Sequence, residues 1–135
     1  MKASALSFRL ATVFAIAGMS MGIAMAIAQD HAVMPAHAHL NLLGWVSLFL
    51  FGIYYRLHAE LEASRLALIQ IGVWSAGTVV LTCAVAGLHV GYTAFEPVAA
   101  VSSIVLIADM VLFAVLVFRP AILTRSSRVA LTPAE

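Results

Sequence analysis

The sequence predicts an all-α membrane protein, a four-transmembrane-helix bundle in an up-down arrangement. Of its 135 residues, 64% are hydrophobic and only 10% are charged, which is too little polarity for the exterior of a soluble domain. Four apolar stretches each approach the roughly 20 residues that a helix needs to cross a bilayer. The spans are predicted over residues 6–28, 36–57, 66–90 and 97–118. Helices are expected because a backbone in lipid must satisfy its own hydrogen bonds.

The first span carries signals for packing and for processing. Gly18 and Gly22 are spaced as in the small-xxx-small pattern by which membrane helices approach closely. The Ala-Ile-Ala sequence at residues 26–28 also fits the end of a cleavable secretory signal. We expect the span to be retained, because the uncharged run of residues 10–28 is longer than a usual signal core. Cleavage would leave three spans in the same orientation.

The connections between spans are short, so consecutive spans are expected to be antiparallel neighbours in one domain covering residues 1–118. Residues 119–135 are expected to form a loosely ordered cytoplasmic tail whose arginines meet anionic membrane lipid. Because four short spans enclose little interior, we also expect a homo-oligomer.

The positive residues predict the orientation, since cytoplasmic connections retain Lys and Arg. All seven fall on one side of the predicted spans: Lys2, Arg9, Arg56, Arg65, Arg119, Arg125 and Arg128. The opposite connections, residues 29–35 and 91–96, contain neither Lys nor Arg. The chain is therefore expected to be a multi-pass protein of the bacterial inner membrane with both termini cytoplasmic. Its net charge of +1 is too small to predict nucleic-acid binding.

Four of the five histidines lie in or beside the outer ends of the predicted spans: His31, His37, His39 and His89. Only His58 belongs to the cytoplasmic connection. Ionisable groups at membrane depth are unfavourable and usually have a role, so several at one level predict a shared site.

The sharpest feature is the pair His37 and His39, which opens the second span. Residues two apart on a helix point about 200° away from each other, so the two imidazoles address two sites or two subunits rather than one ion. Asn41 and Gly44 share the His37 side, where the amide can orient an imidazole and the glycine lets a bulky group approach the backbone. The His39 side continues in residues that can pack on a flat macrocycle: Leu43, Val46, Leu50 and Ile53. Alternatively, both histidines cap the span at the interface and bind nothing.

The run His-Ala-His-Leu-Asn-Leu-Leu-Gly-Trp-Val over residues 37–46 resembles the histidine-bearing helix of the haem-copper oxidase and nitric oxide reductase catalytic subunit, and more closely that of small four-span oxidase-like proteins. In that family the first histidine of such a pair holds the high-spin haem and the second holds the low-spin haem. The resemblance therefore implies His37 and His39 as ligands of haem b iron. The family subunit has three arcs of four helices, so the resemblance also implies that one chain corresponds to one arc and that a homotrimer rebuilds the outline.

The chain departs from the family in its other metal ligands. The large enzymes complete their gas-reducing site with a non-haem metal on further histidines, including an adjacent pair, and no His-His pair occurs here. We therefore expect neither complete oxygen reduction nor proton pumping. If the chain is an enzyme, it is expected to be a haem-dependent oxidoreductase.

Other residues are secondary candidates. His89, at the outer end of the third span, is a candidate ligand or lining residue, and Trp45 is a candidate to stack near a haem. His31 is expected to be solvated, and His58 to be an ordinary interfacial histidine. Copper is not expected, because the methionines of the apolar helices are better explained as packing: Met19, Met21, Met25 and Met34.

Asp109 is the only acid well inside a span, where an unpaired charge would be unfavourable. We expect it to be protonated and hydrogen-bonded at a helix contact. The functional alternative is that Asp109 relays protons or meets Gln70 or Ser75 across the bundle.

These observations leave three hypotheses. The first is a b-type haem protein with a redox or diatomic-gas role, exchanging electrons with a quinol or a periplasmic partner. The second is a cofactor-free interaction or assembly protein of a respiratory complex. The third is a copper or zinc site that uses His37, His39 or His89.

Overall fold

The computed structural model describes residues 1–130, with side chains placed for residues 1–118, and every regular element in that part of the chain is a helix. The elements are α1 (Ala3–Ala28), α2 (Met34–His39), η1 (Leu40–Ser47), α3 (Leu48–Leu57), α4 (Ala59–Glu62), α5 (Arg65–His89), η2 (Thr93–Phe95) and α6 (Glu96–Ala130). Of the residues expected as a loose tail, 119–130 continue α6, and 131–135 lie outside the described residues.

The four predicted spans are confirmed as four helical segments that are long and apolar enough to cross a membrane. They are Ala3–Ala28, Met34–Leu57, Arg65–His89 and Thr93–Phe118. The second of them joins α2, η1 and α3 into one uninterrupted helical rod, which we call the second span. The chain is thus built as a multi-pass membrane protein.

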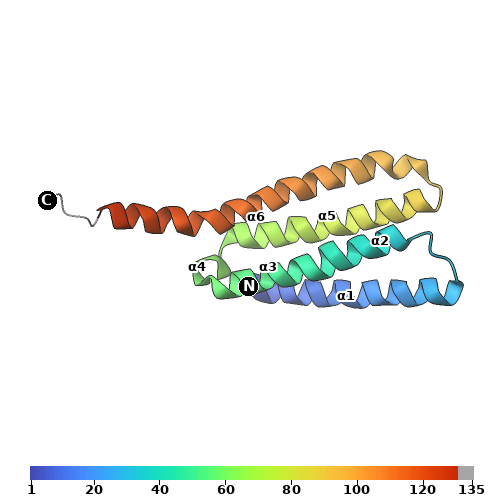
Figure 1. Ribbon diagram of the computed structural model, residues 1–135, viewed down its shortest axis with the longest axis horizontal. Helices are drawn as coiled ribbons and strands as arrows, with labels where there is room; N and C mark the ends of the chain where they lie inside the picture. The colour runs from blue at the N-terminus through green and yellow to red at the C-terminus, as the bar shows by residue number, and fades with distance from the viewer. Residues whose placement is uncertain (131–135) are drawn as a thin grey trace.

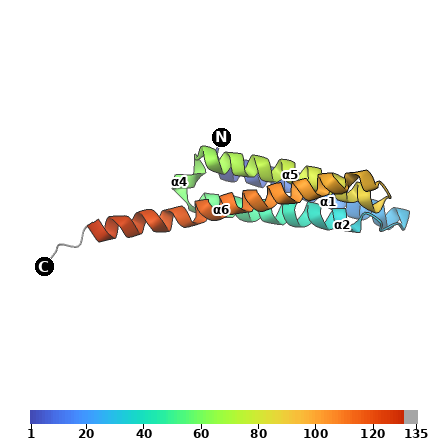
Figure 2. The same cartoon turned by 90° about the horizontal axis from the view of Figure 1, so that it is seen from above.

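The helices lie side by side, and the chain turns back at alternate ends of the unit (Figure 1). α1 packs along the second span, the second span packs on α5, and α5 packs on α6. α1 and α6 lie at opposite edges of this row (Figure 1). The row is staggered, because α5 and α2 lie on either side of α6 when the unit is seen from above (Figure 2).

The two ends of the unit differ in composition. One end, at the right of Figure 1, carries the α1–α2 and α5–η2 connections, and we call it the histidine end. It holds His31, His37, His39 and His89. The other end carries the N-terminus and α4, and we call it the arginine end. It holds Lys2, Arg56 and Arg65.

Aromatic side chains close the half of the unit nearer the arginine end. The ring of Phe51 in α3 lies 5.1 Å, centroid to centroid, from Trp74 of α5 and 4.4 Å from Phe113 of α6. Tyr54 adds an edge contact to Phe113 at 5.4 Å. Such pairs contribute about 0.5–1.5 kcal/mol each beyond the area that they bury, so α3, α5 and α6 are firmly joined here.

Hydrogen bonds fasten α1 to the arginine end. The buried Ser7 hydroxyl donates to the carbonyl oxygen of Leu48 at 2.7 Å. The backbone N–H and the hydroxyl of Ser4 both donate to the carboxylate of Glu62, at 3.1 and 2.6 Å. Arg56 Nη1 lies 3.7 Å from the same carboxylate. The start of the first span is therefore fixed to α3 and to α4.

Candidate functional site

His37 lies in the seam between α1 and the second span. Its ring packs over Gly22 of α1, where an added Cβ would lie only 3.1 Å from the imidazole Cε1. Asn41, one turn later, packs over Gly18, where an added Cβ would lie 2.5 Å from the amide oxygen. The small-xxx-small pair of α1 therefore makes room for these two polar side chains.

The amide of Asn41 accompanies His37, as the helical spacing predicted. Asn41 Nδ2 donates to the carbonyl oxygen of His37 at 2.9 Å and lies 3.4 Å from each ring nitrogen. The distance to the ring is long for a hydrogen bond, so the amide restrains the imidazole only weakly. Gly44 is also on this side, and the bulky group that approaches it is Phe14 of α1, whose Cγ is 2.6 Å from the position of an added Cβ.

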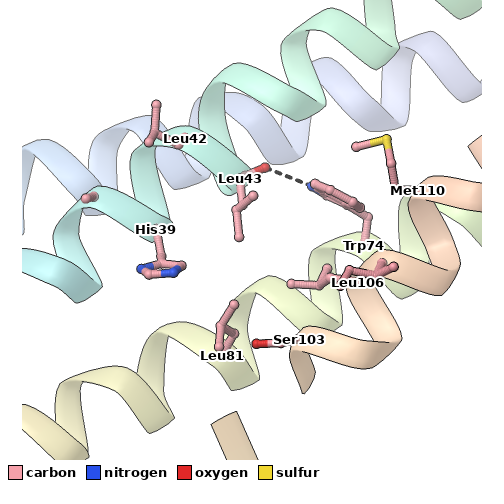
Figure 3. Close-up of a pocket in the computed structure, with 10 residues that line it drawn as sticks. His39, Leu42, Leu43, Trp74, Leu81, Ser103, Leu106 and Met110 are labelled. Carbon is pink, nitrogen blue, oxygen red and sulfur yellow. Dashed lines mark hydrogen bonds between the residues drawn. The ribbon is translucent and has the colours of Figure 1, made fainter. Parts of the chain in front are cut away.

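His39 faces away from this seam and lines an apolar groove of about 450 Å³ (Figure 3). The walls of the groove are the second span and α6, and α5 forms its floor. Its main apolar lining comes in pairs from three helices: Leu42 and Leu43 from η1, Trp74 and Leu81 from α5, and Leu106 and Ile107 from α6. The histidine that the sequence spacing placed opposite His37 therefore lines an apolar groove.

The hydrogen bond of His39 defines which ring nitrogen remains available. Nδ1 lies 2.7 Å from the carbonyl oxygen of Pro35, one turn earlier. Because a carbonyl oxygen only accepts, Nδ1 carries a hydrogen, and in the neutral imidazole Nε2 then has the lone pair. A backbone carbonyl that holds the N–H of one ring nitrogen is the usual support of a histidine that binds a metal through the other.

The helix widens directly after His39. η1 is a π-helix, and within it the hydroxyl of Ser47 donates to the carbonyl oxygen of Leu42, five residues earlier, at 2.9 Å. Trp74 Nε1 donates to the carbonyl oxygen of Leu43 at 2.9 Å, which joins the floor of the groove to η1. π-Helical segments are rare overall, and those that occur are often found at functional sites. Of the residues expected to continue the His39 side, Leu43 lines the groove. The other three are exposed and are not among its lining residues: Val46, Leu50 and Ile53.

The remaining candidates lie apart from the groove. His89 Nδ1 is 2.8 Å from the carbonyl oxygen of Val85, and neither His89 nor the 43% exposed Trp45 is among the lining residues. His31 is exposed, and the ring of His58 stacks on Tyr54 with centroids 4.0 Å apart.

A metal centre made of protein ligands alone has no support in the described part of the chain. There, no group of three or more His, Cys, Asp or Glu side chains is placed to hold a metal ion. The fold leaves His37 and His39 on opposite faces of one helix and does not bring His89 into the groove.

Asp109 is hydrogen-bonded at a helix contact, as predicted. Gln70 Nε2 of α5 donates to its Oδ2 at 3.0 Å. Ser75, the other candidate partner, donates instead to the carbonyl oxygen of Ile71 at 2.7 Å.

Several lining residues were missed by sequence reasoning, among them Trp74, Ser103, Ile107 and Met110. They lie on the third and fourth spans, which are apolar on nearly every side. Periodicity gives little indication of which face of such a helix meets its neighbours. The indole of Trp74 was the one available signal, since a buried Trp N–H needs a partner.

Comparison of the chain with protein-family models, with curated proteins and with solved structures finds no match.

Proposed function

We propose that this chain is a b-type haem-binding protein of the bacterial inner membrane and that His39 would hold the haem iron through Nε2. One observation supports this most directly: the Pro35 carbonyl holds Nδ1 of His39, and the ring lines an apolar groove of about 450 Å³. Bound haem would supply one-electron redox chemistry and the capacity to bind a diatomic gas.

The lining of the groove suits a flat apolar ligand. Leucine and isoleucine side chains from two helices line both walls. The only indole on the floor, that of Trp74, has its N–H committed to the Leu43 carbonyl and therefore offers an apolar ring to the groove. An apolar surround of this kind limits the access of solvent to a bound metal and so tunes its redox potential.

His37 has a different part in this proposal. In the same chain it would have to leave Gly22 and Asn41 to reach a ligand, and its ring faces the opposite side of the second span from the groove. We therefore assign one residue of each chain, His39, to hold the haem, which would supply the capacity to bind a diatomic gas.

We further propose that the up-down unit of four spans resembles one arc of the haem-copper oxidase subunit, that three copies assemble, and that both termini face the cytoplasm. Large apolar side chains are exposed on both edges of the row, among them Ile23 on α1 and Ile104 on α6. Native mass spectrometry of the detergent-solubilised protein tests the trimer. A monomer at all protein concentrations would contradict it.

A cofactor-free interaction or assembly protein of a respiratory complex is the second candidate. The packing of His37 over Gly22 favours it, because this contact gives one histidine of the pair a structural role that needs no cofactor. In that case the groove would hold a helix of the partner or a lipid tail.

Absorption spectra of the purified protein distinguish the two candidates. The comparison needs oxidised and dithionite-reduced spectra of the wild type, His39→Ala, His37→Ala and His58→Ala. His58 is the matched control. Like His39, it has Nδ1 near the carbonyl oxygen one turn earlier, that of Tyr54 at 2.8 Å, but it lies at the arginine end.

The haem proposal expects a Soret band that is lost or shifted in His39→Ala and unchanged in His58→Ala. Loss in His37→Ala as well would replace the single-ligand assignment with a two-histidine one. A colourless wild type that takes up no added haemin would overturn the proposal in favour of the interaction protein.

A further inference from the structure

Three polar side chains from three helices form a hydrogen-bonded row inside the membrane region, in the half nearer the arginine end. Tyr55 Oη of α3 donates to Gln70 Oε1 of α5 at 2.8 Å, and Gln70 Nε2 donates to Asp109 Oδ2 of α6 at 3.0 Å. Tyr55 and Gln70 are fully buried, and Asp109 is 4% exposed. Gln70 lies five residues after Arg65, or about 8 Å along α5 at 1.5 Å per residue.

No cation balances the Asp109 carboxylate within the described residues. The ion pair found there joins Arg56 to Glu62, which lie in and beside the connection at the arginine end. Tyr55 is the titratable group linked to Asp109 through the row. Tyr54, beside it, donates to the carbonyl oxygen of Val117 instead.

Among residues 1–118, whose side chains are placed, no other element brings a charged partner to this acid. Arg65 begins α5 and has no hydrogen bond or ion pair with Asp109, and the same holds for His58 at the end of α3. A carboxylate at this depth without a cation is strongly unfavourable. The more stable form of Asp109 is therefore the one that has bound a proton.

The amide of Gln70 can respond to that proton. As placed, its N–H donates to Asp109, which suits an ionised carboxylate because such a group only accepts. A protonated Asp109 offers an O–H. A half-turn of the amide then presents Oε1 to that O–H and Nε2 to the oxygen of Tyr55. Both hydrogen bonds reverse, and the hydroxyl hydrogen of Tyr55 is released from Gln70.

We propose that Asp109 is a proton-binding site within the membrane and that Gln70 transmits its occupancy to Tyr55. One proton adds to the carboxylate, whose charge goes from −1 to 0, and the side chain of Gln70 rotates without breaking a covalent bond. The proposal uses neither His39 nor the groove, so it is independent of haem binding.

Infrared spectroscopy of the full chain in liposomes tests the site as a function of pH. Asp30 and Asp109 are the only aspartates of the chain, and Asp30 is exposed in the α1–α2 connection. In the Asp30→Asn variant, carbon-13 at the aspartate side-chain carboxyl therefore reports Asp109 alone. Asn at position 30 keeps an oxygen for the N–H of Ala32, which Asp30 accepts at 2.9 Å.

The proposal expects a carboxylic acid C=O band that shifts with the label, appears as the pH falls and is absent from Asp109→Asn. Glu60→Gln, which removes an exposed acid of α4, should keep the band. A labelled carboxyl signal that does not change between mildly acidic and alkaline pH would overturn the proton site.

The role of Gln70 has its own test. Gln29 and Gln70 are the only glutamines, so a carbon-13 label in the side-chain amide of a Gln29→Asn variant follows Gln70 without altering the row. The amide band and a tyrosine ring band that is lost in Tyr55→Phe should change with the same midpoint as the Asp109 carboxyl. An amide band that is constant across this midpoint would overturn the transmission through Gln70.

Discussion

His37 and His39 are separated by one residue of the same helix, yet the fold gives them opposite surroundings. His37 faces α1, where Gly22 and the amide of Asn41 enclose it. His39 faces a groove between the second span and α6, with Nδ1 held and Nε2 available. The face of the helix therefore determines whether a histidine at this end packs on the neighbouring helix or lines the groove.

The two faces of the second span differ in packing for a simple physical reason. On the α1 side, glycines bring the backbones together: Gly18 and Gly22 on α1, and Gly44 and Gly52 on the second span. On the groove side, the span presents leucines, and aromatic contacts near the arginine end join it to α6 through Phe113. The aromatic contacts with Phe113 close the half of this side nearer the arginine end, and the other half contains the groove.

The largest expected effect comes from filling the hollow. Ile107→Trp places an indole where Ile107, 68% exposed, lines the groove, and we expect it to abolish haem uptake. The stability should change by no more than about 0.5 kcal/mol, since the site is on the surface. Haemin titration followed by absorbance measures the uptake.

Ile104→Trp is the matched control for this variant. Ile104 is 66% exposed on the same helix and does not line the groove. Equal haem uptake by the two tryptophan variants would show that the groove is not the binding site.

The next largest effect is expected where the second span packs against α1. In Gly44→Ala, the new Cβ would lie 2.6 Å from Phe14 Cγ and 2.8 Å from Phe14 Cβ, so α1 itself must move. Overpacking of this kind lowers the free energy of unfolding by about 1–3 kcal/mol. Denaturation in mixed micelles with increasing SDS measures the change.

Gly72→Ala adds the same methyl group where no heavy atom lies within 4 Å. It should leave stability unchanged or slightly raise it, because Ala favours a helix over Gly by up to about 1 kcal/mol. If both alanine variants were as stable as the wild type, the seam would be less tightly packed than described.

A smaller effect is expected from a single buried hydrogen bond. Ser7→Ala removes the hydroxyl that donates to the Leu48 carbonyl at 2.7 Å and should lower the free energy of unfolding by about 0.5–1.5 kcal/mol. Thr12→Ala serves as the control, since the exposed hydroxyl of Thr12 bonds only within its own helix, to the Phe8 carbonyl. Equal losses in the two variants, measured in the same SDS titration, would contradict a specific role for the Ser7 bond.

The smallest effect is a pH dependence at the arginine end. Burial raises the pKa of Glu62, but the hydrogen bonds from Ser4 and the charges of Arg56 and Lys2 outweigh it and hold the pKa below its ordinary value. A carboxyl with a lowered pKa in the folded state stabilises the fold above its unfolded pKa and loses this contribution as the pH falls through the folded value.

The difference in unfolding free energy between the wild type and Glu62→Gln should therefore be largest near neutral pH and shrink on acidification. Glu60→Gln, at an exposed position of the same short helix, should differ from the wild type by an amount that hardly changes with pH. A difference between wild type and Glu62→Gln that is constant from neutral to acidic pH would rule out the proposed contribution of Ser4 and Arg56.

The fold was predictable from the sequence to the extent that it follows from composition. Long apolar runs have one stable arrangement in a bilayer, so all four spans were found. Two contacts were also predictable. One is that between Asn41 and His37, four residues earlier, and the other is that between the isolated acid Asp109 and Gln70. In each case a polar group in an apolar span needed a neighbour within reach.

The parts that were not predicted depend on how helices meet. The π-helical segment η1 follows no local pattern, and it supplies Leu42 as well as the expected Leu43 to the groove. Gly44 was read as room for a bulky group, and Phe14 of the adjacent helix occupies that room. The lining of the groove by α5 and α6 depends on the rotation of two nearly uniform apolar helices, which is set by tertiary packing. The assignment of His37 and His39 as haem ligands stays a prediction.

The central claim is that Nε2 of His39 binds haem iron. It is tested most directly by removing the side chain and supplying imidazole from solution. His39→Gly removes the imidazole from the wall of the groove, and free imidazole can then be added during haem reconstitution. We expect His39→Gly to lose the Soret and reduced bands of the wild type and to regain them with added imidazole, whereas His37→Gly should show no such rescue. A His39→Gly spectrum identical to that of the wild type, with or without imidazole, would contradict the claim.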